Sequence, residues 1–218
     1  MSAYGYCYNN PVRYIDPMGM SAEPPNDYVF DEKGKFVRVD KNDQPHRIHI
    51  ENKKTGENRY YHFADPINDS KDIANGIINK IEFVKEDKVF KMLSDRGAFK
   101  SENSGYKAFY DKSRGGQDFD FRYSTIINEF KNPSQSLYIV DGEFTAHNFA
   151  NFGNWLWGAA GYTLGYEYLS LKTGGHINSL VNSETNGYGS QWDSEDDQNS
   201  IVEGAYFSHT HNYRTYVK

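Results

Sequence analysis

A stretch near the C-terminal end, NFGNWLWGAAGYTLGY (residues 151–166), limits most strongly what this chain can fold into. Its apolar residues recur at spacings of one, three and four, which predicts a helix that is apolar on most of its faces. Such a helix must be buried. Each glycine in it costs about 1 kcal/mol relative to alanine, so we expect a neighbouring helix or a substrate against the backbone. The glycines are Gly153, Gly158, Gly161 and Gly165.

The composition favours a folded chain that needs neither disulfides nor metal. With 218 residues, the chain can form one domain or two small ones and bury a core unaided. A single cysteine, Cys7, excludes an internal disulfide and a cysteine-based zinc site. No phosphate-binding glycine motif is present, so we expect no metal and no nucleotide cofactor. The chain also lacks a signal-peptide pattern, and the apolar run before Glu167 is shorter than the ~20 residues that span a bilayer.

The charge is unevenly distributed along the chain. The formal net charge is -6, and residues 146–218 contain only three of the 24 Lys and Arg residues but seven of the 30 Asp and Glu residues. Nucleic-acid affinity depends largely on cationic contacts to phosphate. The C-terminal segment alone therefore makes a poor face for RNA.

The pattern of apolar residues predicts the order of the elements. Short alternating segments over residues 28–63 are separated by the turn sequences EKGK, DKNDQP and NKKTGE, which is typical of a β-meander. Residues 69–96 fit helix, strand and helix, residues 100–117 fit a long polar loop, and residues 137–140 fit a further strand. The Pro-rich residues 21–27 fit a linker. We therefore predict an α+β fold, with an N-terminal β-meander followed by a mainly α-helical domain.

The segment DFDFRY (residues 118–123) carries the first candidate site residues. Alternation predicts a strand with Asp118, Asp120 and Arg122 on one side. A carboxylate and a guanidinium two residues apart can form a half-exposed ion pair. Alternatively, Asp120 points into a pocket, with Arg122 beside it to bind a substrate.

The acidic segment DSEDDQ (residues 193–198) carries the second set. Acidic residues in a first helical turn suit the positive end of the helix dipole, so the segment can simply begin a helix. Capping does not require Gln198 or two carboxylates four residues apart. Asp193 and Asp197 are therefore also candidates for a carboxylate pair in which one member stays protonated. Asn154 is an amide among aromatic residues, so it either bonds a second element or faces a site.

The N-terminal residues resemble a known junction. YGYCYNNPVRYIDPMGM (residues 4–20) closely resembles the signature that ends the core of RHS-repeat proteins and precedes a variable C-terminal toxin. In that family the Asp-Pro-x-Gly turn lies at an autoproteolytic junction, which the resemblance would place just after Gly19 or Met20. The residues that cut lie upstream in the family, so we expect no self-cleavage by this chain. Residues 1–20 would then be a remnant of the upstream RHS shell.

From about residue 118 the chain resembles the bacterial polymorphic toxin type 44 family. The matching pieces are Asp120-Phe121, Gly153-Asn154 with Gly158, Gly174-x-His176, and D-x-x-x-D-Q at Asp193, Asp197 and Gln198. The resemblance implies a toxin domain over residues 98–218, with residues 28–97 as a β-rich first part. Many members of that family carry an acid next to the Gly-Asn pair, where this chain has Asn151. If that acid is catalytic, this copy is weak or inactive.

These patterns define one set of candidate residues. The predicted catalytic residues are Asp120, Asn154, His176, Asp193, Asp197 and Gln198, and the predicted substrate-binding residues are Arg122, Asn151 and Trp155.

The resemblance implies a secreted toxin that the RHS carrier delivers into neighbouring bacteria, with a cognate immunity protein as partner. The activity predicted first is that of a hydrolase, a metal-independent ribonuclease in which His176 or His147 supplies acid and base and Asp120 or Asp197 orients the imidazole. The first alternative is a peptidoglycan hydrolase that uses Asp120 with Asp193 or Asp197 as a carboxylate pair. A pore-forming or inactive toxin is the further alternative.

Overall fold

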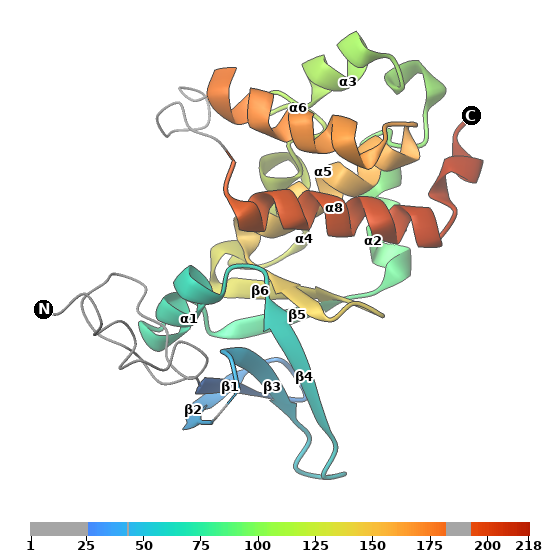
Figure 1. Cartoon of the computed structure of the whole chain (residues 1–218). Helices are drawn as coiled ribbons and strands as arrows, with labels where there is room; N and C mark the ends of the chain where they lie inside the picture. Colours follow the sequence, from blue (N-terminus) through green and yellow to red (C-terminus); the bar gives the residue numbers. More distant parts are fainter. Residues whose placement is uncertain (1–25, 43, 182–192) are drawn as a thin grey trace, which may run out of the picture. The chain divides into compact units, whose positions relative to one another are not determined.

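The computed structural model describes residues 26–42, 44–181 and 193–218. The described residues form two compact units (Figure 1). The first contains the residues up to Phe83 together with Ser134–Ala146, and the second contains Val84–Pro133 and His147–Lys218. The chain thus returns to the first unit through a short segment, whereas the sequence analysis placed a boundary at residue 97. The predicted RHS remnant, residues 1–20, lies outside the described residues.

Among the described residues, the strands form one seven-stranded sheet in the order β2-β1-β3-β4-β7-β6-β5. Their apolar residues alternate or run continuously, as expected for strands with one or both faces covered. The strands are β1 (Asn26–Asp31), β2 (Phe36–Lys41), β3 (Arg47–Glu51), β4 (Asn58–Phe63), β5 (Lys80–Val84), β6 (Ser136–Val140) and β7 (Thr145–His147). The four strands predicted between residues 28 and 63 and the strand at 137–140 are therefore confirmed. The linker predicted over residues 21–27 ends inside β1.

The predicted fold was wrong in its arrangement, although an α+β composition is consistent with the structure. A meander requires neighbouring antiparallel strands in chain order. Here β1 pairs with β2 antiparallel and with β3 parallel, and β4 pairs with β7 parallel. The later strands β5, β6 and β7 complete the same sheet. The sheet is therefore mixed and contains strands from two separated segments, which periodicity within residues 28–63 cannot indicate.

The sheet curls so that the start of β5 meets the turn between β1 and β2. Lys35 and Lys80 form an antiparallel bridge, and the Ile81 N–H donates to the Gly34 carbonyl at 2.7 Å. Gly34 has a φ of +78°, and a Cβ at this position would lie 2.2 Å from the Ile81 carbonyl oxygen. Only glycine fits this close approach. The curled sheet and α1 (Pro66–Ala74) enclose an apolar core. Its larger members include Tyr28, Phe30, Ile48, Ile50, Phe63, Ile73, Ile81, Leu137 and Ile139.

The second unit is mainly helical. Its elements are α2 (Glu86–Asp95), η2 (Ser101–Asn103), α3 (Tyr106–Lys112), the π-helix η3 (Arg122–Ile126), α4 (Ile127–Glu129), α5 (Phe149–Thr163), α6 (Tyr168–Val181), α8 (Glu195–Thr210) and η5 (Tyr213–Tyr216). The short η4 (Pro133–Gln135) precedes β6. The helix predicted from the aromatic, glycine-rich stretch is confirmed as α5, and most of its residues are buried. Asn148 caps it, because its side chain accepts hydrogen bonds from the N–H groups of Ala150 and Asn151.

The helices α5 and α8 lie side by side and touch through glycine (Figure 1). A Cβ at Gly158 would lie 2.0 Å from the Ile201 carbonyl oxygen, and a Cβ at Gly204 would lie 1.8 Å from the Trp155 carbonyl oxygen. The two helices therefore pack backbone against backbone. Of the two explanations that the sequence left open for the glycines, a neighbouring helix accounts for Gly158.

Two local predictions between α2 and β6 were wrong. Residues 100–117 are not one loop, because they include η2 and α3. Residues 118–123 are not a strand, because the Asp120 carbonyl accepts the N–H groups of Tyr123 and Ser124 and so starts a helical turn. Phe119 and Phe121 are both buried and stack with ring centroids 5.9 Å apart. The alternation of apolar residues here comes from this pair of rings.

Candidate functional site

A pocket of about 940 Å³ opens in the second unit between α3, η3, α5, α6 and the start of α8. Aromatic side chains form a substantial part of its wall, among them Tyr106, Phe109, Tyr110, Phe119, Trp157 and Tyr166. Its polar side chains include Asp120, Arg122, Asn154, Asp193 and Asp197. An apolar pocket with a few converging polar groups is the usual form of a ligand site. Five of the nine predicted site residues therefore line one pocket, although they come from three separate parts of the sequence.

Asp197 is a pocket carboxyl whose pKa is raised. It is half-buried near the start of α8. The Asn154 Nδ2 group donates to its Oδ1 at 2.6 Å, and the Ser194 hydroxyl donates to its Oδ2 at 2.9 Å. Burial raises the pKa of Asp197 to about 6, and the charges of Asp196 and Asp193 add to this shift. The two hydrogen bonds oppose the rise without cancelling it. Asp197 can therefore carry a proton at mildly acidic pH.

Asp193 is the second carboxyl at this end of the pocket. The buried Gln198 donates from Nε2 to Asp193 Oδ2 at 2.7 Å. A Cβ at Gly175 of α6 would lie 2.6 Å from the same oxygen and 2.9 Å from Gln198 Nε2. Gln198 therefore holds the Asp193 carboxylate in position, although Gln198 does not itself line the pocket. The glycine at 175 leaves room for this pair.

The acidic segment also begins α8, as its composition predicts, with Ser194 as the N-cap residue and acids in the first turn. Beginning the helix and lining the pocket are compatible roles, because different side chains of the segment perform them. Asp193 and Asp197 line the pocket, whereas Asp196 accepts a hydrogen bond from Asn151 Nδ2 at 3.1 Å.

Asn151 and Trp155 do not line the pocket. Both are almost fully buried, and Trp155 packs on Phe207 with ring centroids 5.0 Å apart. The Asn151 amide lies opposite Asp196. An aspartate at position 151 would face a second carboxylate, so the asparagine suits this helix interface electrostatically.

The predicted ion pair within residues 118–122 does not form. Asp118 pairs instead with Lys112 at 2.5 Å and lies 3.9 Å from Arg96. Asp120 lines the pocket, and its Oδ2 accepts the Gly116 N–H at 2.7 Å. Arg122 also lines the pocket and lies over the Tyr123 ring, 4.7 Å from its centroid.

The two histidines proposed for acid and base chemistry lie outside the pocket lining. His176 is half-buried in α6. His147 is 1% exposed, with Nδ1 3.1 Å from the Ser200 hydroxyl and Nε2 3.2 Å from the Glu203 carboxylate. A histidine enclosed in this way has no direct access to a substrate.

Sequence reasoning missed the aromatic wall. Tyr106 and Tyr110 stack four residues apart on α3, with centroids 6.4 Å apart and an angle of 13° between the rings. Trp157 is fixed by a hydrogen bond from Nε1 to the Ser113 hydroxyl at 2.8 Å. The (i, i+4) spacing of the two tyrosines was the available signal, but it was lost when residues 100–117 were assigned to a loop.

No family model matches the chain, and neither the curated proteins nor the solved structures contain a match. Within residues 26–42, 44–181 and 193–218, no helix is long and apolar enough to cross a bilayer. The same residues contain no group of three or more His, Cys, Asp and Glu side chains that could hold a metal ion.

Proposed function

We propose that the second unit is a hydrolase that acts on a glycan, with Asp197 as general acid and Asp193 as its ionised partner. The observation that carries this proposal is a carboxyl with a pKa of about 6 in an aromatic pocket that holds further carboxylates. Glycoside hydrolysis uses a protonated carboxyl to protonate the leaving oxygen and an ionised one on the opposite side of the sugar. Aromatic walls suit the apolar faces of sugar rings.

The charge of the pocket favours a glycan over RNA. Three aspartates line it, and Arg122 is the one basic side chain in the described lining. RNA binding gains most of its affinity from several cationic contacts to phosphate. The ribonuclease prediction also relied on His176 or His147, which lie outside the lining. Ribonuclease activity therefore becomes the competing outcome of the test.

The toxin role rests on sequence resemblance alone. Residues 4–20 resemble the end of an RHS core, and residues 118–207 resemble polymorphic toxin type 44. We propose on this ground that the glycan is peptidoglycan, that delivery depends on an RHS carrier, and that an immunity protein binds the chain. A toxin that attacks the cell wall would harm bacteria only from the periplasmic side.

The test compares purified chain on isolated peptidoglycan and on total RNA, with mass spectrometry of the released fragments. We expect soluble saccharides from peptidoglycan and intact RNA. Asp197→Asn should lower saccharide release at least a hundredfold, because the general acid is lost. Glu195→Gln, on the exposed first turn of the same helix, is the matched control and should retain activity. Degradation of RNA with no release of saccharide would overturn the proposal.

A further inference from the structure

Among the described residues, Arg122 has no ion pair, although it lines an acidic pocket. In the part of the chain that the structure describes, its only side-chain interaction is with the Tyr123 ring. Two other arginines of the second unit have acidic neighbours: Arg96 lies 3.9 Å from Asp118, and Arg214 lies 3.0 Å from Glu167. The hydrogen-bonding capacity of Arg122 is therefore available to a ligand.

The pocket carboxylates, in contrast, are already hydrogen-bonded. Asp120 accepts the Gly116 N–H, Asp193 accepts Gln198 Nε2, and Asp197 accepts Asn154 and Ser194. Within the described residues, no ion pair joins Arg122 to Asp120 or Asp197.

The position of Arg122 is fixed by the backbone. A Cβ at Gly153 of α5 would lie 3.2 Å from Arg122 Cβ and 3.4 Å from its backbone nitrogen. The first turn of η3 therefore packs closely on α5 one residue before Asn154, which bonds the proposed general acid. Arg122 and Asp197 therefore contact two consecutive residues of α5, Gly153 and Asn154.

We infer that Arg122 binds a carboxylate carried by the substrate, so that the glycan cleaved here is an acidic one, such as a peptidoglycan strand whose lactyl carboxylates are not amide-linked to peptide. This inference rests on the proposed function and names the substrate class of the same site. A guanidinium binds a carboxylate through two parallel hydrogen bonds, a geometry that lysine cannot reproduce. Against three aspartates, one such contact lets an acidic sugar enter and fixes its orientation. A phosphate could use the same guanidinium, and the experiment separates these two sources of negative charge.

The experiment measures binding by calorimetry in the Asp197→Asn background, so that cleavage is not needed for a signal. The probes are a disaccharide of N-acetylglucosamine and N-acetylmuramic acid with a free lactyl carboxylate, the same disaccharide amidated at that group, and a short RNA. We expect Arg122→Gln to weaken binding of the free acid about tenfold and to leave binding of the amide unchanged. Arg122→Lys should recover only part of the loss.

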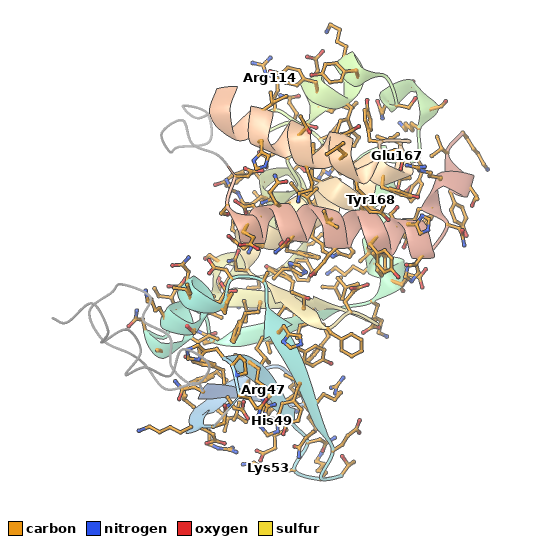
Figure 2. All side chains as sticks on the ribbon, viewed as in Figure 1. Arg47, His49, Lys53, Arg114, Glu167 and Tyr168 are labelled. Carbon is orange, nitrogen blue, oxygen red and sulfur yellow. The ribbon has the colours of Figure 1, made fainter. Side chains whose placement is uncertain are left out.

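The control variant is Arg114→Gln, on the exposed loop that follows α3 and outside the pocket lining (Figure 2). It should bind all probes as the parent does, and thermal unfolding of each variant reports whether the fold is retained. Equal loss of the free acid and the amide, no loss at all, or no binding of either disaccharide would overturn the inference. Arg122-dependent binding of RNA alone would assign the guanidinium to phosphate. Release of neutral and acidic saccharides at equal rates would overturn the inference while the proposed hydrolase stands.

Discussion

At the scale of single residues, Asp197 has the clearest consequence. Its pKa of about 6 in the folded chain exceeds the ordinary value for aspartate because the carboxyl is half-buried beside other acids. The folded state therefore binds the proton more tightly than the unfolded state. The stabilisation from this group is complete below about pH 4 and is lost as the pH rises through 6.

This linkage can be measured through the free energy of unfolding. We predict that the free energy of unfolding of the parent chain decreases by about 1–2 kcal/mol from pH 4 to pH 7 because of Asp197, and that Asp197→Asn abolishes this decrease. The figure is smaller than the full pKa shift implies, because the group is partly solvated. Urea unfolding at both pH values measures the difference, with Glu195→Gln as control. Asparagine also loses the hydrogen bond from Ser194, so the pH dependence is the informative quantity and the absolute stability is not. An unchanged pH dependence would show that Asp197 titrates normally.

The pH dependence of activity follows from the same proton. A general acid must be protonated, so saccharide release should fall about tenfold per pH unit above pH 6. Initial rates between pH 4 and pH 8 measure this limb. Replacing Asp196 by Asn removes one of the charges that raise the pKa and should move the limb to lower pH. A rate that rises towards pH 8 would contradict the role of Asp197 as acid.

The sequence pointed to Asp193, Asp197 and Asn154 because their residue types are costly or redundant for a purely structural role. All three residues line the pocket, and their catalytic role stays a prediction. His176 lies outside the lining, because its place in the sequence does not indicate which face of α6 borders the pocket. Likewise, the sequence does not indicate which face of α5 borders the pocket, and Asn151 and Trp155 lie in the buried helix interface instead.

At the scale of elements, the crossing of α5 and α8 depends on two glycines. We predict that Gly204→Ala destabilises the chain by about 1–3 kcal/mol, because its Cβ would lie 1.8 Å from the Trp155 carbonyl oxygen and the helices must move apart. Chemical unfolding measures the loss. Gly105→Ala is the matched control, since nothing lies within 4 Å of its added Cβ and its φ is negative. Equal effects of the two substitutions would show that the crossing tolerates a side chain.

Element type was predictable where periodicity and packing agree. The helix α5 could be predicted because its apolar residues recur at helical spacing over one long continuous stretch, and that stretch is buried as the spacing implies. The segment DFDFRY alternates like a strand but turns into η3, because the Asp120 carbonyl accepts hydrogen bonds from the following turn and its two phenylalanines stack on each other. Alternation over so few residues does not separate these outcomes.

At the scale of the whole molecule, the two compact units share the chain in an interleaved order. All five residues of β6 are buried, and their sheet partners belong to the first unit. A fragment of residues 98–218, the predicted toxin domain, would carry β6 and β7 without most of that sheet. We predict that this fragment aggregates, whereas the full chain is monodisperse by size-exclusion chromatography. A soluble and active fragment would show that the sheet is dispensable.

The order of the strands could not be predicted from the sequence, because pairing between strands far apart in the chain produces no periodic pattern of residues. The strands at 28–63 carry the correct alternation, yet their neighbours in space include strands more than 80 residues away along the chain, such as β7 beside β4. The order of strands depends on which edges meet in three dimensions, and the composition of each strand is compatible with several orders.

The glycine contact between α5 and α8 affects the candidate site as well as the stability of the fold. Two short amides, Asn151 and Asn154, bridge to aspartates on the facing helix only because the helices are so close. Any substitution that spreads the crossing would stretch the bridge to Asp197 and admit water around its carboxyl. The pH at which the proposed hydrolase works would then depend also on residues of the α5–α8 contact that do not touch the substrate.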